Sequence, residues 1–256
     1  MGAADKPTRI AHIRRCLETN GRVDCADLAT HFGVSEMTIR RDLAQLEKEG
    51  AAIRIHGGAI FPVGTGSELS FNTKMRVRME EKRRIGLAAS EMVVDGDTII
   101  LDSGTTTLCL AEHVKRRRGL TVITNGLAIA NELLDRHGIE VMVPGGIIRS
   151  FSHSLVGPET ERALQRLNAD KLFLGVEGLD PVRGLTVQDS LDAKVKEAMI
   201  QAAREIIVVA DSSKVNIVKM VLVASMDVVS TVITDGRAPD EFIEALEHEG
   251  INVVIA

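Results

Sequence analysis

Residues 102–107, Asp-Ser-Gly-Thr-Thr-Thr, form the segment of this sequence best suited to bind an anion. The segment follows an apolar run at 98–101 and leads directly into apolar residues at helical spacing over 108–114. Small residues let backbone N–H groups approach a ligand, hydroxyl groups add donors, and the start of a helix favours negative charge. The segment therefore predicts a phosphate site, although it matches neither a Walker loop nor a dinucleotide-binding fingerprint. Helix capping by Ser103 or Thr105 is the simpler alternative.

Four later apolar runs also end in small, hydroxyl, amide or charged residues, which are Thr124-Asn125-Gly126, Pro144-Gly145-Gly146, Gly175-Val176-Glu177 and Asp211-Ser212-Ser213-Lys214. Because the carboxyl ends of parallel strands meet at one crevice, these groups are expected to converge on one pocket. Arg149 and Lys214 are suited to neutralise a phosphate, although each alone could equally be a surface charge. Asp102, Asn125 and Glu177 are suited to hydrogen-bond sugar hydroxyl groups. The residues expected to bind a phosphorylated sugar are Asp102, Ser103, Gly104, Thr105, Thr106, Thr124, Asn125, Gly145, Gly146, Arg149, Glu177 and Lys214.

The carboxylates keep an enzyme among the candidate functions. A sugar-phosphate isomerase needs a general base beside the bound carbonyl group, a role open to Glu177, Asp180 and Asp211. Lys214 would then be an electrostatic partner. A scaffold protein that only binds phosphosugars would use the same pocket. Steady conversion of a sugar phosphate would support the isomerase, whereas an effect of the sugar phosphate on DNA binding would support a sensor.

A second pattern, at residues 34–59, indicates DNA as a ligand. At about 100° per residue, Ile39, Leu43 and Leu46 fall on one stripe of a predicted helix. The opposite side gathers the polar side chains Thr38, Arg41, Gln45 and Lys48. Ser35 is placed to cap the helix, whose N-terminus suits a phosphate-lined groove. An ordinary amphipathic surface helix is the alternative.

Two further helices and a hairpin are predicted around this recognition helix. Apolar residues recur at helical spacing over 10–17, and Asp24 begins a short helix that ends before Gly33. The break at Gly33 supplies the turn of a helix-turn-helix. Residues 52–55 alternate before His56-Gly57-Gly58, as in a small hairpin or wing. The residues expected to contact DNA are Ser35, Thr38, Arg40, Arg41, Gln45, Arg54 and His56.

The chain is expected to divide into a DNA-binding domain at 1–60, a linker at 61–73, and a domain for effector sensing and oligomerisation at 74–256. Small residues over 61–67 mark the linker. Buried strands of a mainly parallel α/β sheet are expected at 98–101, 120–124, 139–143, 171–176, 206–210, 228–234 and 253–255. Irregular or antiparallel pieces are expected at 147–155 and 182–185. The basic segment 74–84 begins a predicted helix and is either a solvated face or a surface that couples the domains.

The motifs Val-Ser-x-x-Thr-Ile-Arg-Arg-Asp-Leu, Leu-Glu-x-x-Gly and Arg-x-His-Gly-Gly-Ala within the first sixty residues resemble the winged helix-turn-helix of the DeoR family of bacterial transcriptional regulators. Residues 75–256 resemble the carboxyl-terminal effector domain of the same family through Leu-Asp-Ser-Gly-Thr-Thr-Thr, Val-Ile-Thr-Asn, Gly-Gly-Ile-Ile-Arg, Phe-Leu-Gly-Val-Glu-Gly and Asp-Ser-Ser-Lys. The resemblance implies a fold similar to that of ribose-5-phosphate isomerase. It also implies a regulator, more often a repressor, of sugar catabolism genes that responds to a phosphorylated sugar.

Two departures from the family's pattern bear on the identity of the effector. The family often has Glu where Asp192 stands in this chain. The Asp192 side chain is therefore shorter than that Glu by one methylene group. Val215-Asn216-Ile217 follows Asp-Ser-Ser-Lys, where the family commonly has a Phe or small residue and then Gly.

Composition favours a DNA-binding oligomer. The chain has 256 residues, 45% of them hydrophobic, and a formal net charge of -5. Residues 1–60 hold nine Lys and Arg against eight Asp and Glu, so the predicted DNA-binding domain is nearly neutral. DNA affinity then needs locally placed charge and more than one copy of the domain, as on a palindromic operator in double-stranded DNA.

Other ligand classes are disfavoured. Cys16, Cys25 and Cys109 lie far apart with no His at ligand spacing, so neither a metal site nor a disulfide framework is expected, and no cofactor is predicted. The absence of Trp and Tyr argues against aromatic stacking on bases. No apolar run reaches about eighteen residues, so we expect no membrane partner and a cytoplasmic location.

Overall fold

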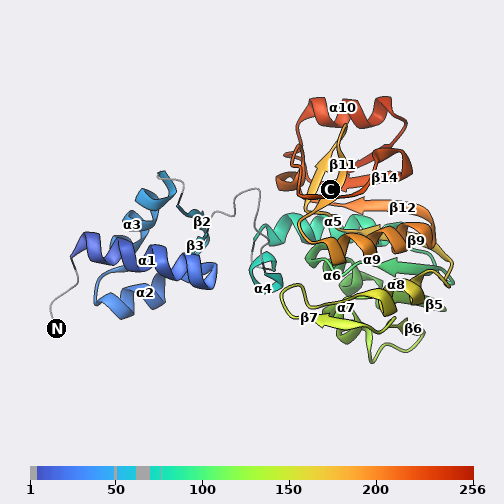
Figure 1. Ribbon diagram of the computed structural model, residues 1–256, viewed down its shortest axis with the longest axis horizontal. Helices are drawn as coiled ribbons and strands as arrows, with labels where there is room; N and C mark the ends of the chain where they lie inside the picture. Colours follow the sequence, from blue (N-terminus) through green and yellow to red (C-terminus); the bar gives the residue numbers. More distant parts are fainter. Residues whose placement is uncertain (1–4, 49–50, 62–69, 76) are drawn as a thin grey trace. The chain divides into compact units, whose positions relative to one another are not determined.

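The computed structural model describes residues 5–48, 51–61, 70–75 and 77–256. The chain divides into two compact units, Met1–Val77 and Arg78–Ala256 (Figure 1). Of the linker expected at 61–73, residues 62–69 lie outside the described residues. The short helix α4 (Phe71–Lys74) follows them within the first unit.

The first unit combines helices with a small antiparallel sheet. Its other elements are α1 (Lys6–Asn20), β1 (Arg22–Asp24), α2 (Cys25–Phe32), α3 (Glu36–Lys48), β2 (Ile53–Ile55) and β3 (Gly58–Ile60). The strand order is β1-β3-β2, so the predicted hairpin is present and β1 adds a strand that the sequence did not predict. Gly58 makes this third pairing possible, because a Cβ there would lie 2.1 Å from the Val23 carbonyl oxygen.

Local sequence signals account for the helix boundaries. The Asp24 side chain accepts a hydrogen bond from the Ala26 N–H at 2.9 Å and so caps α2. Gly21 and Gly33 end α1 and α2 in the left-handed region, with φ values of 70° and 63°. The predicted stripe of α3 is buried, since Ile39, Leu43 and Leu46 are each at most 1% exposed. The tight turn after α2 therefore leads into α3 as a helix-turn-helix requires.

The second unit alternates strands and helices. Up to the middle of the unit these are α5 (Met79–Glu91), β4 (Thr98–Leu101), α6 (Thr105–Val114), β5 (Leu120–Thr124), α7 (Leu127–Leu133), β6 (Ile139–Met142), β7 (Ile147–Arg149), β8 (Ser154–Val156), α8 (Pro158–Leu164) and β9 (Ala169–Leu174). The others are β10 (Gly178–Asp180), β11 (Gly184–Val187), α9 (Ser190–Gln201), β12 (Ala203–Val209), the 3-10 turn η1 (Ser212–Lys214), β13 (Val221–Ala224), the 3-10 turn η2 (Met226–Val228), β14 (Thr231–Thr234), α10 (Asp240–His248) and β15 (Asn252–Ile255).

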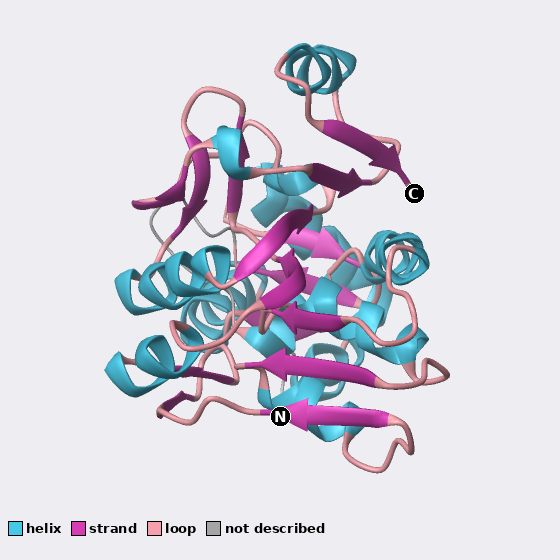
Figure 2. Ribbon diagram, turned by 90° about the vertical axis from the view of Figure 1, so that its right-hand side faces the viewer, coloured by secondary structure: helices cyan, strands magenta, loops and turns pink. Residues whose placement is uncertain are grey.

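A seven-stranded parallel sheet forms the centre of this unit, in the order β15-β14-β12-β9-β4-β5-β6 (Figure 2). The α/β fold with a mainly parallel sheet is thus confirmed. Strands β7 and β8 pair as an antiparallel hairpin, and β10, β11 and β13 form a separate antiparallel sheet, close to the irregular pieces that were expected. The strand expected at 228–234 begins only at Thr231, because η2 occupies 226–228.

The direction of winding reverses between β4 and β9. From β4 the chain moves outward through β5 to β6, and then returns to β9 on the other side of β4. From there it proceeds through β12 and β14 to β15. In open α/β sheets a ligand crevice is expected at such a reversal, beyond the carboxyl ends of the two central strands, because the connections leave them on opposite faces.

Apolar packing fixes helices against both faces of the sheet. On one face, Ile100, Leu172 and Val208 share a buried core with residues of α9 and α10 such as Met199 and Phe242. On the other face α5 packs closely against α6. The helix predicted to begin in the basic segment 74–84 is α5, which starts only at Met79.

Within the described residues, no helix is long and apolar enough to cross a membrane. The three cysteines are free, and burial raises the pKa of Cys109 to about 11. A thiol with so high a pKa is unreactive at neutral pH and acts as a small core side chain.

Gly86 tests the packing of α5 against α6. A Cβ at this position would lie 2.7 Å from both the Cys109 carbonyl carbon and the Leu110 nitrogen. Helix propensity alone predicts that Gly86→Ala stabilises the protein by about 1 kcal/mol. We expect destabilisation by about 1–3 kcal/mol instead, because the backbone of α6 must move. Urea denaturation decides the sign. Gly236→Ala, where the nearest atom is 3.8 Å away, is the control and should change little.

Candidate functional site

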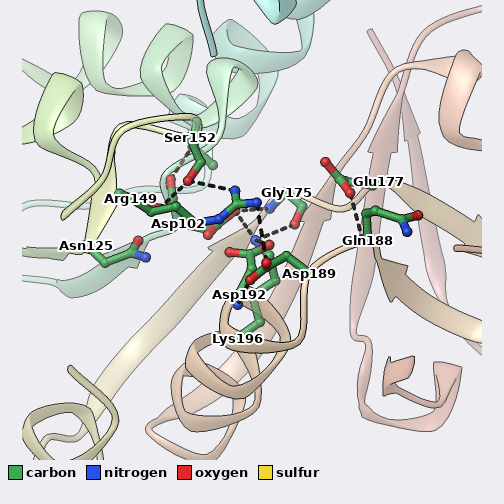
Figure 3. Close-up of polar contacts among 12 residues, drawn as sticks. Asp102, Asn125, Arg149, Ser152, Gly175, Glu177, Gln188, Asp189, Asp192 and Lys196 are labelled. Atoms are coloured by element: carbon green, nitrogen blue, oxygen red, sulfur yellow. Dashed lines mark hydrogen bonds and ion pairs between the residues drawn. The ribbon is translucent and has the colours of Figure 1, made fainter. Parts of the chain in front are cut away.

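A buried ion pair lies at the carboxyl ends of β4 and β9, where the winding reverses, a place called the candidate crevice from here on. Lys196 Nζ of α9 is 2.6 Å from Asp102 Oδ2, just beyond β4, and 3.7 Å from Asp192 Oδ2 (Figure 3). It also donates a hydrogen bond to the Gly175 carbonyl oxygen, just beyond β9, at 3.0 Å. Lys196 is 4% exposed and Asp102 is 1% exposed. One ammonium group thus joins α9 to the ends of both central strands.

The lysine is charged in this environment. Burial by itself would lower the pKa of Lys196, but attraction by Asp102 and Asp192 outweighs burial and raises the pKa. The Gly175 N–H donates to Asp102 Oδ2 at 3.2 Å and stabilises the carboxylate further. The crevice is therefore built around a full positive and a full negative charge.

Two buried oxygen atoms at this place have no hydrogen-bond partner among the described residues. They are Oδ1 of Asp102 and Oδ1 of Asn125. The Asn125 side chain is fixed by its own Nδ2, which donates to the Leu155 carbonyl oxygen at 3.1 Å. An unsatisfied buried acceptor costs about 1–3 kcal/mol, so both atoms call for a donor. Ligand hydroxyl groups would supply such donors.

The start of α6 offers a place for an anion beside these acceptors. Gly104 occupies the N-cap position and no side chain caps the helix there. The alternative of capping by Ser103 or Thr105 is therefore wrong. Thr107 Oγ1 instead donates to the Gly104 carbonyl oxygen at 2.7 Å and holds the turn. The first N–H groups of a helix have no acceptor within the helix, so they remain available to an anion.

Arg149 lies at the edge of the crevice and is held by the start of α9. Its Nη2 is 3.4 Å from Oδ2 of Asp189, the N-cap residue of α9, and its Nη1 donates to Ser152 Oγ at 3.1 Å. Figure 3 shows Arg149, Asp102, Asp189, Asp192 and Lys196 converging on one place. The guanidinium group of Arg149 thus lies beside the predicted acceptor Asp102, although the carboxylate of Asp189 is paired with it.

Other predicted residues have structural contacts of their own. Glu177 accepts a hydrogen bond from the Gln188 N–H at 2.9 Å, off to one side in Figure 3. Thr124 Oγ1 accepts from the Gly126 N–H at 3.0 Å and stabilises the turn after β5. The 145–146 turn is tied to α8, since the Gly145 carbonyl oxygen accepts from Thr160 at 2.7 Å. Lys214 lies in η1, beyond β12, which is the strand next to β9.

Neither Lys196 nor Asp189 was among the residues predicted from the sequence to form the site. Lys196 follows Asp192 by one helical turn and stands three residues from both Ala193 and Met199, which are buried. A lysine inside an apolar stripe is a sign of a buried ion pair, and this sign was available. Asp189 could be recognised only as a helix cap, because its pairing with Arg149 depends on tertiary structure.

In the first unit, α3 presents its polar face as predicted. Ser35 Oγ accepts from the Thr38 N–H at 3.3 Å, which caps the helix. Arg41 is exposed, whereas Arg40 is paired with Glu36 at 3.1 Å. Gln45 is half-buried. Arg41 is therefore the predicted contact residue best placed to reach a base.

A buried ion pair also fixes this helix. Arg9 Nε of α1 donates to Asp42 Oδ2 of α3 at 2.5 Å, and both side chains are at most 8% exposed. The exposed residues Arg54 and His56 lie on the hairpin. Arg54 Nη1 is 3.8 Å from Glu47 Oε2 of α3, and the Gly57 carbonyl oxygen accepts from the Cys25 N–H at 2.8 Å. These contacts attach the wing to α3 and α2.

One chain that carries a winged helix-turn-helix and an α/β domain with a candidate ligand crevice has the architecture of a ligand-responsive transcriptional regulator. The protein-family model for the DeoR-like helix-turn-helix domain matches residues 9–64. The family model for the DeoR C terminal sensor domain matches residues 77–236. The protein belongs to the DeoR family of transcriptional regulators.

Curated relatives match nearly the whole chain. The HTH-type transcriptional regulator GlpR of Haloferax volcanii is 36% identical over 99% of this chain and 98% of its own. The HTH-type transcriptional repressor GlcR of Bacillus subtilis is 33% identical over 96% and 95%. The glycerol-3-phosphate regulon repressor of Escherichia coli is 30% identical over 94% and 95%.

Solved structures match more distantly. Ribose 5-phosphate isomerase A from Methanocaldococcus jannaschii aligns with a TM-score of 0.40 and 16% identity over 54% of each chain. The sorbitol operon regulator SorC from Klebsiella pneumoniae aligns with a TM-score of 0.37 and 13% identity over 82% of this chain and 90% of its own.

Replacing Lys196 should reveal how much the crevice depends on the buried pair. We expect Lys196→Met to destabilise the protein by about 3–5 kcal/mol, because Asp102 is left as a buried carboxylate without its partner. Adding Asp102→Asn should recover most of the loss, since the uncompensated charge is then gone. Urea denaturation measures both. Lys194→Met, an exposed residue of the same helix paired with Glu197, is the control and should change little. Equal stability of the Lys196→Met and Lys194→Met variants would show that the buried pair of Lys196 and Asp102 does not stabilise the protein.

Proposed function

We propose that this protein represses genes for the uptake or catabolism of a sugar or sugar derivative and that a phosphorylated sugar controls it. The observation that carries the proposal is the uncapped start of α6 beside two buried acceptors, Asp102 Oδ1 and Asn125 Oδ1. The helix start suits a phosphate, and the acceptors suit hydroxyl groups. A phosphorylated polyol has both groups in one small molecule.

The proposal assigns a role to each part of the chain. Residues 1–60 bind double-stranded operator DNA, 61–73 form the linker, and 74–256 sense the effector and form a homo-oligomer in the cytoplasm. The proposed DNA contacts are Ser35, Thr38, Arg40, Arg41, Gln45, Arg54 and His56. The proposed effector contacts are those expected from the sequence, with Asp102, Gly104, Asn125 and Arg149 central and Lys196 as the residue that holds Asp102 in place.

The names of the relatives support this effector class. The Escherichia coli relative is named for the glycerol-3-phosphate regulon, and glycerol 3-phosphate is a phosphorylated polyol. Its similarity to this chain extends over both units.

The contacts of the candidate catalytic carboxylates favour a sensor over an isomerase. Asp180 Oδ1 accepts from the Val182 and Arg183 N–H groups at 3.0 and 2.8 Å and shapes the turn after β10. Glu177 is engaged by Gln188, and Asp211 is paired with Arg78. These contacts give each carboxylate a structural role, and a winged helix-turn-helix on the same chain would have no use in an isomerase. We therefore propose that the protein is not an enzyme.

Regulation requires that the effector distinguish two states of the protein. An effector with equal affinity for the DNA-binding and the released state would shift nothing, however tightly it bound. The coupling must also be reciprocal, so operator DNA should weaken effector binding by the factor by which effector weakens operator binding.

Two arginine variants test the DNA-binding surface. Arg41→Ala should weaken binding to the operator by about 1–3 kcal/mol if the side chain contacts a base edge. Arg54→Ala in the wing should weaken binding to all sequences alike and flatten its dependence on salt, because it removes a phosphate contact. Fluorescence anisotropy with the protein's own upstream DNA and a scrambled duplex measures both.

Arg15→Ala, which removes an exposed arginine of α1, controls for the loss of one positive charge. Wild-type operator affinity in Arg41→Ala would show that the recognition face has been assigned wrongly.

A charge placed at the start of α6 tests the phosphate site. Gly104 has the extended backbone of an N-cap residue, with φ -75° and ψ 158°, so Asp or Ser can cap the helix there. Gly104→Asp should abolish the thermal stabilisation by a phosphorylated sugar, because its carboxylate takes the place of the anion. Gly104→Ser caps the helix without charge and should retain more of the response.

Both variants place a Cβ 3.1 Å from Thr107 Oγ1, so the crowding caused by the Cβ is the same in each. Operator affinity without effector should match that of the wild type in both. An unchanged ligand response in folded Gly104→Asp would rule out a phosphate at this helix start.

A further inference from the structure

Arg78 has an unusual backbone conformation at an important position in the chain. It is the first residue of the second unit and the N-cap residue of α5. Its φ of 52° lies in the left-handed region, which it shares only with His153 and Asn216 among the described non-glycine residues. A long side chain is found there only when its surroundings hold it in place.

The side chain of Arg78 shows what holds it. Its Nη1 donates to Ser212 Oγ at 2.8 Å, and its Nε lies 3.7 Å from Asp211 Oδ1. Asp211 is 3% exposed, so this contact reaches into the protein. Asp211 and Ser212 belong to the turn 211–214 beyond β12, which also carries Lys214, a proposed effector contact.

The turn 211–214 is itself well ordered by buried groups. The Ser212 N–H donates to Asp235 Oδ2 at 2.7 Å, and the Ser213 N–H donates to Asp211 Oδ1 at 3.0 Å. Burial opposes ionisation of Asp235, but hydrogen bonds from the Ser212 and Arg237 amides hold its pKa below the ordinary value. These bonds hold the residues of the turn to one another and to the end of β14, and Arg78 is attached to the same group.

A second ion pair links the same helix to the neighbouring strand end. Glu81 lies in the first turn of α5, and its Oε1 is 3.1 Å from Nη1 of Arg237, which follows β14. The start of α5 is thus attached to the carboxyl ends of both β12 and β14.

We propose that Arg78 is the positioning residue through which effector binding reaches the DNA-binding half of the chain, an inference that rests on the proposed function. An anion that engages Lys214 moves the turn 211–214, and Arg78 follows the turn because its guanidinium is bound to Asp211 and Ser212. Arg78 directly follows Val77, where the chain arrives from the first unit. Release of the side chain lets the backbone leave the left-handed region, so the start of α5 has two discrete states.

The experiment measures coupling rather than binding, on full-length protein. The probe is whichever of glycerol 3-phosphate, ribose 5-phosphate and glucose 6-phosphate most raises the Tm of the wild type. The operator Kd for the protein's own upstream DNA is measured by anisotropy with and without saturating probe. For the wild type, we expect a ratio of these constants of at least about fivefold, the lower end of typical allosteric coupling.

Arg78→Ala should reduce this ratio to within about twofold of unity, while the operator Kd without probe and the thermal shift with probe stay near wild-type values. Ser212→Ala removes the hydrogen-bond partner of Arg78 from the other side and should also reduce the ratio. Arg83→Ala, on the same helix but paired with Glu80 at the surface, is the matched control and should keep the wild-type ratio.

The outcomes separate the two proposals. A wild-type protein that no probe stabilises or releases from its operator would overturn the proposed function, and this inference with it. A wild-type ratio retained in both Arg78→Ala and Ser212→Ala would overturn the role of Arg78 alone. Loss of the thermal shift in Arg78→Ala would also overturn it, because Arg78 would then be a binding residue.

Discussion

The buried pair of Lys196 and Asp102 fixes the geometry on which the candidate crevice depends. A charged pair deep in a protein has a large desolvation cost, which good geometry and additional hydrogen bonds must offset. Here the Gly175 backbone supplies those bonds from β9, so the pair ties α9 to β4 and β9 at the reversal of the sheet. One carboxylate oxygen is used in this way. The other, Asp102 Oδ1, is left as a fixed acceptor with no partner among the described residues.

In the first unit, too, a buried ion pair fixes a helix, here beside the surface proposed to bind DNA. Arg9 and Asp42 form a buried pair between α1 and α3. The pair sets the rotation of α3 about its axis, because Asp42 must face α1 and its neighbour Arg41 is then exposed. A buried apolar stripe alone tolerates small rotations of its helix, whereas a buried charge pair does not, since a lost contact leaves both charges unsatisfied. In each unit, one ion pair thus fixes the helix beside the surface that is proposed to bind a ligand.

Patterns within a few neighbouring residues predicted the helices and strands. Contacts between residues far apart in the sequence were missed. The stripe of Ile39, Leu43 and Leu46 and the break at Gly33 act within a few residues, so they could be recognised in advance. The polar ends of the strands also predicted the side of the sheet on which Asp102 and Asn125 lie. The ion-pair partners of Arg78 and Arg149 could not be found in this way, because Asp211 and Asp189 lie more than thirty positions away along the chain. Strand β1 was missed because it consists of three residues that pair only with β3.

The two helix starts at the crevice are not equivalent, and the difference orients the proposed ligand. The first turn of α9 already holds the carboxylates Asp189 and Asp192, which satisfy its dipole and repel a second anion. The first turn of α6 holds hydroxyl groups and no acid. The proposed phosphate would therefore bind at α6, with the hydroxyl groups of the same molecule directed toward Asp102 and Asn125. Asp192, where the family often has Glu, stays 3.7 Å from Lys196, so Asp102 is the closer partner of the ammonium group.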